Sequence, residues 1–191
     1  MSRPRLLLDQ SLFWVDTAPV SPSGKQPAPA PDDRSIQAAI KQTRPFRSRR
    51  QEAMVGLLLT AEAVRWPLQD LLAGHEQLTL QQYNVLRILR GAGPTGLPTL
   101  AIGERMIERT PGVTRLLDRM EQKGLVVRER DATDRRVVVC RITDAGSTLL
   151  RQLDRPVDAL DEEVLKGLRD AEVAELIRLL DKVRLHNTRR T

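Results

Sequence analysis

Four arginines stand close together near the middle of the chain, on both sides of a short polar segment. They are Arg128, Arg130, Arg135 and Arg136. A guanidinium group stays charged at physiological pH and donates hydrogen bonds in a fixed fork, which matches phosphate oxygens and base edges. Arginines at the tip of a hairpin can also enter a narrow minor groove, where the potential is strongly negative. The cluster therefore predicts a contact with a polyanion such as DNA.

A second set of polar residues lies just upstream, over 111–122. Apolar side chains at Val113, Leu116, Leu117 and Met120 follow the i, i+3, i+4, i+7 spacing of a helix with one buried stripe. Thr110 is suited to the N-cap of this helix and Pro111 to its first position. The opposite face then presents polar side chains that can reach bases and phosphates. These are Thr114, Arg115, Asp118, Arg119 and Gln122.

Other kinds of chemistry find little support. His75 and His186 are the only histidines, and neither has a metal-ligand spacing around it. Residues 91–96 match G-x-G-x-x-G, but they follow a helix and Pro94 removes an amide, which predicts a loop. No serine lies on a nucleophile turn. We therefore expect no enzyme activity, no metal and no cofactor. The single Cys140 is expected to be a packed, inert thiol.

The elements that must position the two polar sets can be read from periodicity and caps. Helices are predicted over about 47–73, with a kink at Pro67, over 78–90 with a Thr79/Gln82 capping box, and over 99–106. Two β-branched runs, 125–130 and 136–142, predict a hairpin. Helices over about 144–166 and 170–187 complete the chain. Three helices followed by a hairpin are the order of a winged helix-turn-helix module, whose last helix enters the major groove.

Charge and composition agree with this interpretation. Residues 78–143 hold twelve Lys and Arg against seven Asp and Glu, while the whole chain has a net charge of +6. Such a basic excess in one module is typical of a polyanion-binding face. No apolar run is long enough to span a membrane, and the N-terminal apolar run is too short for a signal peptide. We expect a cytoplasmic protein without membrane contact.

At this point the sequence resembles the multiple-antibiotic-resistance-regulator (MarR) family. The resemblance covers about 78–146 and is most specific in DRRVVVCRITDAG, where Asp134, Arg136, Thr143 and Gly146 stand in register with the wing pattern of the family. It implies a mainly α fold with a small β-hairpin wing and added dimerisation helices. It also implies a homodimer that reads a near-palindromic operator on double-stranded DNA. Most relatives are repressors that respond to a small aromatic or lipophilic effector.

The resemblance also suggests a division of the chain and roles for single residues. We expect a flexible arm and linker over 1–35, an N-terminal dimerisation region over 36–77, the winged module over 78–143 and C-terminal dimerisation helices over 144–191. Arg135 resembles the arginine of the wing tip that enters the minor groove. Asp134 and Arg136 are expected to brace the wing, by pairing with each other or with Asp118.

Two questions stay open from the sequence. Trp66, His75 and Tyr83 are candidates to line an effector cleft, because planar side chains with polar tips can hold a planar ligand, but ordinary packing explains them as well. The alternative function is a winged-helix protein-interaction module without sequence-specific DNA binding, since a fold alone does not fix a function. The four clustered arginines favour DNA binding over that alternative.

Overall fold

The structure is a computed structural model, and it describes residues 35–107, 112–131 and 133–188. The chain divides into two units, residues 1–47 and 48–191. The described part of the first unit holds one short helix, α1 (Ile36–Ala39), whose N-cap Ser35 accepts a hydrogen bond from the Ala38 amide at 3.1 Å. No periodic pattern predicts α1, because four residues are too few to show one. The predicted arm and linker, up to residue 34, lie outside the described residues.

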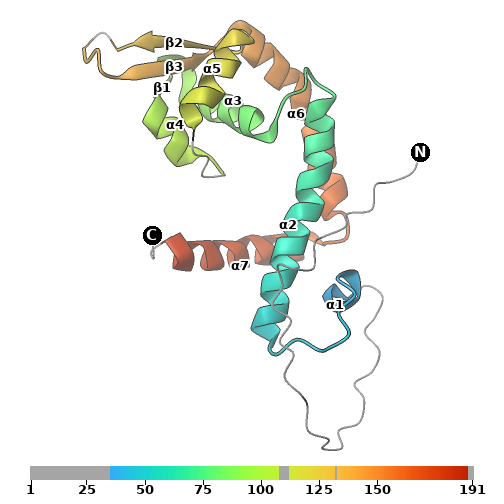
Figure 1. Ribbon diagram of the computed structural model, residues 1–191. Helices are drawn as coiled ribbons and strands as arrows, with labels where there is room; N and C mark the ends of the chain where they lie inside the picture. Colours follow the sequence, from blue (N-terminus) through green and yellow to red (C-terminus); the bar gives the residue numbers. More distant parts are fainter. Residues whose placement is uncertain (1–34, 108–111, 132, 189–191) are drawn as a thin grey trace, which may run out of the picture. The chain divides into compact units, whose positions relative to one another are not determined.

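The second unit holds the other helices and a small sheet (Figure 1). In chain order the elements are α2 (Arg49–Ala73), α3 (Leu80–Ala92), the 3-10 turn η2 (Gly93–Thr95), β1 (Leu97–Pro98), α4 (Thr99–Arg105), α5 (Val113–Gln122), β2 (Val126–Arg130), β3 (Val138–Ile142), α6 (Asp144–Leu165) and α7 (Asp170–Thr188). The fold is mainly helical with a small antiparallel sheet, as predicted. The predicted helices and the hairpin agree with these bounds to within about two residues at most ends.

The start of α3 shows how local sequence sets an element. The Thr79 hydroxyl accepts a hydrogen bond from the Gln82 amide at 3.2 Å, and the Gln82 side chain accepts one from the Thr79 amide at 3.1 Å. This reciprocal pair satisfies two amides that the first turn of a helix leaves without partners. The predicted capping box is confirmed. Of the G-x-G-x-x-G segment, Gly91 and Ala92 end α3 and the next three residues form the η2 turn, so the segment is not a phosphate-binding loop at the start of a helix.

Among the described residues, the sheet has three antiparallel strands in the order β1-β3-β2. Val126 to Arg130 pair with Ile142 to Val138, so that Arg128 lies opposite Cys140. On the other side of β3, Leu97 also pairs with Cys140. The two residues of β1 were not predicted, because so short a strand carries no alternation of apolar and polar residues. The third strand fixes the base of the hairpin to the segment between α3 and α4.

A single apolar core joins these elements. Its fully buried members come from the end of α2, from α3, α4, α5 and β3, and from the first half of α6; they are Leu72, Val85, Leu86, Leu89, Ile102, Leu117, Met120, Cys140, Leu150 and Leu153. The first half of α6 therefore packs together with the helix-turn-helix elements. This packing fixes α5 and the hairpin on one compact body.

Two long helices leave much apolar surface uncovered. On α2 the exposed large apolar residues are Met54, Leu57, Leu58, Val64 and Trp66. On α7 they are Ile177, Leu179, Leu180, Val183 and Leu185. The predicted amphipathic pattern of α2 thus does not produce a stripe buried within one chain, since only Gly56 and Leu72 of this helix are buried. Despite these apolar residues, none of the described helices is long and apolar enough to cross a membrane.

Candidate nucleic-acid interface

Helix α5 presents one apolar and one polar face, as its spacing predicts. Leu116, Leu117 and Met120 are buried, while Thr114 and Arg115 are exposed. Arg119 and Gln122 continue the exposed face toward the end of the helix, and Asp118 is half-buried. Because the buried stripe holds the helix in the core, its polar face is presented to solvent in a fixed orientation.

The start of α5 differs from the prediction. The helix begins at Val113, and its N-cap is Gly112, which has a φ of 102° and provides no side-chain cap. This left-handed backbone conformation suits glycine because it has no Cβ atom. The predicted cap Thr110 and the predicted first residue Pro111 lie outside the described residues. The first described turn of α5 thus begins two residues after the position that the Thr-Pro pair predicts.

The side chain of Asp131 forms hydrogen bonds with the backbone of the hairpin turn. Its Oδ1 accepts hydrogen bonds from the amides of Thr133 at 2.8 Å and Asp134 at 3.0 Å, and these bonds lower the pKa of the Asp131 carboxyl. The backbone closes the turn, since the Asp131 amide donates to the Val137 carbonyl and the Val137 amide donates to the Asp134 carbonyl, both at 2.9 Å. A local Asx turn of this kind shapes a loop without help from a core.

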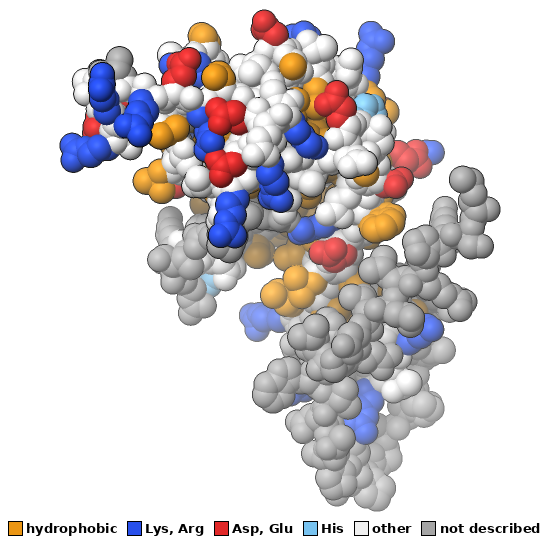
Figure 2. All heavy atoms as spheres, turned by 45° about the horizontal axis from the view of Figure 1, so that its top comes forward, with side chains coloured by type: hydrophobic (Ala, Val, Ile, Leu, Met, Phe, Trp, Pro, Cys, Tyr) orange, Lys and Arg blue, Asp and Glu red, His pale blue; other side chains and the backbone are white. Residues whose placement is uncertain are grey.

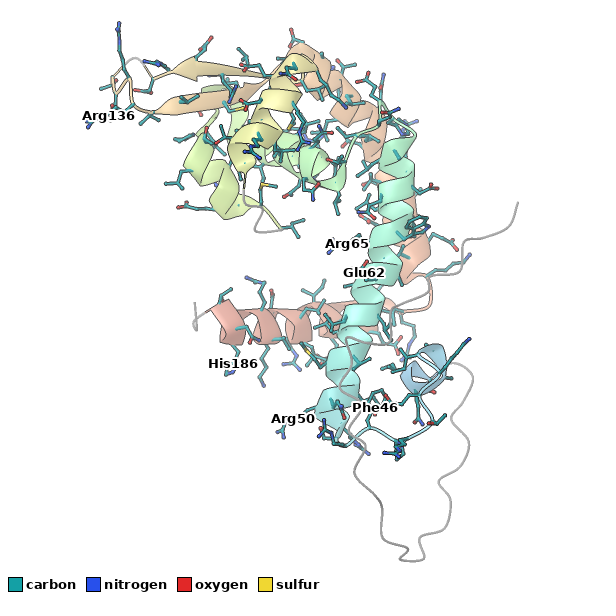
Figure 3. The ribbon with its side chains drawn as sticks, in the orientation of Figure 1. Phe46, Arg50, Glu62, Arg65, Arg136 and His186 are labelled. Carbon is teal, nitrogen blue, oxygen red and sulfur yellow. The ribbon has the colours of Figure 1, made fainter. Side chains whose placement is uncertain are left out.

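The arginines that follow Asp134 in this turn are exposed. Arg135 and Arg136 are exposed, and Lys and Arg side chains gather around the end of the hairpin in the space-filling view (Figure 2). The Arg136 side chain is 93% exposed and lies at the far end of the hairpin (Figure 3). Arg130, at the end of β2, is exposed as well. Three of the four clustered arginines therefore lie at or next to the tip.

Of the two pairings considered for Asp134 and Arg136, the structure has the one between these two residues. Arg136 Nε lies 3.2 Å from Asp134 Oδ1, and the Arg136 amide donates to the same oxygen at 3.0 Å. Asp118 takes no part in this pair and instead lies 2.6 Å from Arg128 Nη2. Asp134 thus pairs with Arg136 within the tip, and Asp118 pairs at the base of the hairpin.

Arg128 lies in the middle of β2, and its expected place at the hairpin tip is wrong. Its Nε and Nη2 donate to Glu121 Oε2 at 3.0 and 2.7 Å, and its amide donates to Glu121 Oε1 at 3.0 Å. The side chain is only 20% exposed. Sequence reasoning missed Glu121, although a carboxylate near the end of a helix and an arginine on the following strand are close enough to meet across the intervening turn.

The three residues proposed for an effector cleft have separate surroundings. Trp66 is exposed on α2, while His75 Nδ1 lies 2.9 Å from the Leu71 carbonyl oxygen. Tyr83 is buried on α3, where its hydroxyl accepts a hydrogen bond from Arg87 Nη1 at 3.2 Å and its ring lies under the same guanidinium. Their described contacts run to other partners and not to one another.

Cys140 is a packed core residue, as predicted. It is fully buried in β3, and burial raises the pKa of its thiol to about 11. Since the thiolate is the reactive form of cysteine, this environment makes the group inert near neutral pH.

The arrangement is that of a winged helix-turn-helix module with an exposed recognition helix and a basic wing, and comparisons with known proteins agree. The model of the MarR family matches residues 78–138. Over 107 residues the chain is 35% identical to the uncharacterized HTH-type transcriptional regulator YkoM of Bacillus subtilis, a match that covers 56% of this chain and 68% of YkoM. A crystal structure of a MarR transcription factor from Planctomyces limnophilus is 40% identical, covers 72% of this chain and 98% of its own, and has a TM-score of 0.56. The chain belongs to the MarR family.

Membership of this family gives the general function of the protein. MarR proteins are transcriptional regulators and not enzymes, and this member is a DNA-binding protein with the winged helix-turn-helix fold. A cysteine-to-serine mutant of E. coli MarR, solved in complex with operator DNA, is 28% identical, with a TM-score of 0.57 over 69% of this chain and 95% of that one.

Proposed function

We propose that this MarR-family protein is a ligand-responsive repressor that binds a near-palindromic operator as a homodimer. The observation that carries the proposal is the joint exposure of the polar face of α5 and the arginine-bearing tip of the hairpin. Both are fixed to one core, so that a duplex can meet a helix in its major groove and a wing in the adjacent minor groove.

The proposal assigns different contacts to the two parts. Thr114 and Arg115, near the start of α5, contact base edges in the major groove. Arginine can donate two hydrogen bonds to guanine, and threonine can hydrogen-bond to a base or pack against the methyl group of thymine. Arg119 contacts phosphates further along the helix. At the wing, Arg135 enters the minor groove, and Arg130 and Arg136 bind phosphates of the DNA backbone on either side of it. Thr110 and Pro111, before α5, remain candidates for contacts at the start of the recognition helix.

Homodimerisation is supported by the apolar surface that one chain leaves uncovered. Five large apolar side chains on α2 and five on α7 are exposed, and Trp66 alone is 53% exposed. Large exposed apolar patches mark surfaces that bind a partner. We assign residues 36–77 and 144–191 to dimerisation, 78–143 to DNA binding and 1–35 to an appended arm. A twofold dimer presents two recognition helices about one helical turn of DNA apart, which suits a near-palindromic site.

We assign the ligand response to the region where the dimerisation helices meet the winged module. Trp66 on α2, His75 after α2 and Tyr83 on α3 are the candidates to contact a small aromatic or lipophilic effector, although in this structure their surroundings are separate. Here Arg87, which lies 5.8 Å above the centre of the Tyr83 ring, adds a cation that a polar group of the effector can engage. Binding at this place would shift the two recognition helices relative to one another and release the operator.

The test uses a duplex selected from a random library by the full-length dimer. Arg115→Ala should weaken binding to the selected duplex by about tenfold or more, and much less to a scrambled duplex, because a base contact discriminates between sequences. Arg90→Ala on α3, which removes a half-exposed arginine that pairs with Asp154 and has no assigned DNA contact, is the control and should leave the ratio of the two affinities unchanged. An equal loss on both duplexes would place Arg115 on the phosphates, and failure to select any sequence would reject the operator-binding proposal.

A further inference from the structure

We propose that Arg128 is a positioning residue, which holds the wing against the recognition helix through Glu121 and Asp118 and does not itself contact DNA. The inference rests on the proposed DNA contacts of α5 and the hairpin tip. It separates Arg128 from Arg130, Arg135 and Arg136, with which the sequence alone groups it.

The contacts of Arg128 join a strand to a helix at three points. Glu121 Oε2 accepts hydrogen bonds from Nε at 3.0 Å and from Nη2 at 2.7 Å. Glu121 Oε1 accepts a third bond from the Arg128 amide at 3.0 Å. One carboxylate thus binds both the backbone and the side chain of the same strand residue. This geometry restrains the angle of β2 relative to the end of α5, because the two oxygens of Glu121 are held at once by the backbone and by the side chain of Arg128.

The second carboxylate explains why an arginine is needed at this position. Asp118 lies one turn before Glu121 on the same helix, and like charges at this spacing repel each other and would repel phosphates. Arg128 Nη2 lies 2.6 Å from Asp118 and 2.7 Å from Glu121, so that one cation neutralises part of both charges. The hydrogen bonds from Arg128 lower the pKa of the Glu121 carboxyl, and those carboxylates raise the pKa of Arg128.

Exposure separates Arg128 from a DNA contact. Its side chain is 20% exposed, whereas that of Arg136 is 93% exposed. To reach a phosphate, Arg128 would have to abandon two charge-assisted hydrogen bonds to Glu121 and leave two carboxylates on the DNA-facing helix without a counter-charge. Hydrogen bonds to a phosphate would only replace interactions of the same kind, so the exchange offers no net advantage.

Because the Arg128 contacts lie some distance from the hairpin tip, a small rotation of the hairpin at Arg128 moves the tip by a larger distance. The tip begins at Asp131, three residues beyond Arg128, or about 10 Å at roughly 3.3 Å per residue. A rotation of about 10° at the base then displaces the tip by about 2 Å, which is enough to break a hydrogen bond. Loss of the Arg128 contacts should therefore weaken the binding of Arg135 in the minor groove without removing any group that contacts DNA.

Glu121→Gln tests this inference because electrostatics and positioning predict opposite results. If Glu121 were only a surface charge, its neutralisation would reduce repulsion of DNA and tighten binding. The positioning role predicts about tenfold weaker binding to the selected duplex, the loss expected for one charge-assisted hydrogen bond. The matched control is Glu104→Gln, which neutralises an exposed carboxylate on α4 and should leave binding unchanged or slightly tighter. Unchanged or tighter binding by Glu121→Gln would overturn the inference.

A second variant tests whether Arg128 touches phosphate. The double substitution Arg128→Gln with Glu121→Gln keeps the net charge constant and should bind about as weakly as Glu121→Gln alone. Its affinity should fall with salt as steeply as that of Glu121→Gln alone, because both variants lose the same positioning contacts and Arg128 itself makes no phosphate contact. A slope lower by about 1 in the double variant than in Glu121→Gln would show that Arg128 contacts DNA and would overturn the inference.

A readout without DNA keeps this inference separable from the proposed function. In the free protein, hydrogen exchange of segment 126–142 should be faster in Glu121→Gln than in the wild type and in Glu104→Gln, while the thermal unfolding of all three stays similar. Unchanged exchange in this segment would overturn the positioning role. Failure of the wild type to select a duplex would instead count against the proposed function alone.

Discussion

Gly146, in the first turn of α6, lies so close to the carbonyl oxygen of Leu125 that a Cβ atom at this position would overlap with it. Thr143 holds the same junction from the side, since its hydroxyl donates to the Gly124 carbonyl at 2.7 Å and accepts from the Gly146 amide at 3.0 Å. The start of α6 is thereby docked on the turn that joins α5 to β2. The start of α6, the end of the recognition helix and the first wing strand therefore meet at one closely packed junction.

The docking of α6 predicts a large effect of Gly146→Ala. The added methyl group meets backbone and not the flexible end of a side chain, so the turn or the helix must shift, at a cost of about 1–3 kcal/mol in the free energy of unfolding. Urea unfolding measures this change. Gly167→Ala is the control, because a Cβ atom there meets nothing within 4 Å, and it should be neutral or slightly stabilising. Equal stability of the two variants would show that α6 is not docked closely on Leu125.

The Asx turn at the wing tip predicts that Asp131→Ala and Asp131→Asn differ. Asparagine keeps the side-chain oxygen that accepts from the Thr133 and Asp134 amides, while alanine removes it. We expect Asp131→Ala to weaken operator binding and Asp131→Asn to remain near the wild-type affinity in a titration of the selected duplex. Tighter binding by both variants would mean that Asp131 acts only as a charge that repels DNA.

The same carboxyl gives a pH dependence with a defined sign. The pKa of Asp131 is lowered from 3.8, so its contribution to the order of the tip is present at neutral pH and is lost as the pH falls below about 3.8. Hydrogen-bonded amides of residues 133 and 134 should stay protected at pH 5 in an NMR titration. Loss of their protection already between pH 7 and pH 5 would contradict the bonds to Asp131.

Cys140 should not react with thiol reagents in the native protein. It should also make the free energy of unfolding depend on pH above pH 9. Its pKa is raised from 9.0 to about 11, so burial of the neutral thiol stabilises the fold below pH 9 and this contribution is lost as the pH rises toward 11. Between pH 8 and pH 10.5, the stability difference between the wild type and Cys140→Ala should shrink by about 2 kcal/mol. Rapid alkylation of the native protein at pH 8 would contradict the buried position.

Sequence patterns located most elements of this fold because each has a strong local cause. The Thr79/Gln82 box and the apolar stripe of α5 are complete within a few residues, and the hairpin is marked by two β-branched runs. The sequence predicts the start of α5 two residues too early, because a Thr-Pro pair is a favourable helix start. Gly112, the N-cap residue in the structure, has no side chain that could signal this position.

The side-chain partners were harder to predict because they depend on register and packing. Charge pattern alone grouped Arg128 with the tip, yet its place opposite Cys140 in the sheet puts it beside the end of α5 and within reach of Glu121. The apolar pattern of α2 predicted a buried face, and one chain alone leaves most of that face exposed. Periodicity shows that a face is apolar but not whether the same chain covers it.

The most direct test of the proposed function is fluorescence anisotropy of the full-length protein with duplexes that tile the DNA upstream of its own coding region, over a salt series and against a scrambled duplex. We predict tight, saturable binding to one near-palindromic duplex at two chains per site, with an affinity that falls as salt rises. Equal, weak binding to all duplexes that vanishes with salt would contradict sequence-specific recognition at these sites, and would leave only the general attraction between a basic surface and a polyanion.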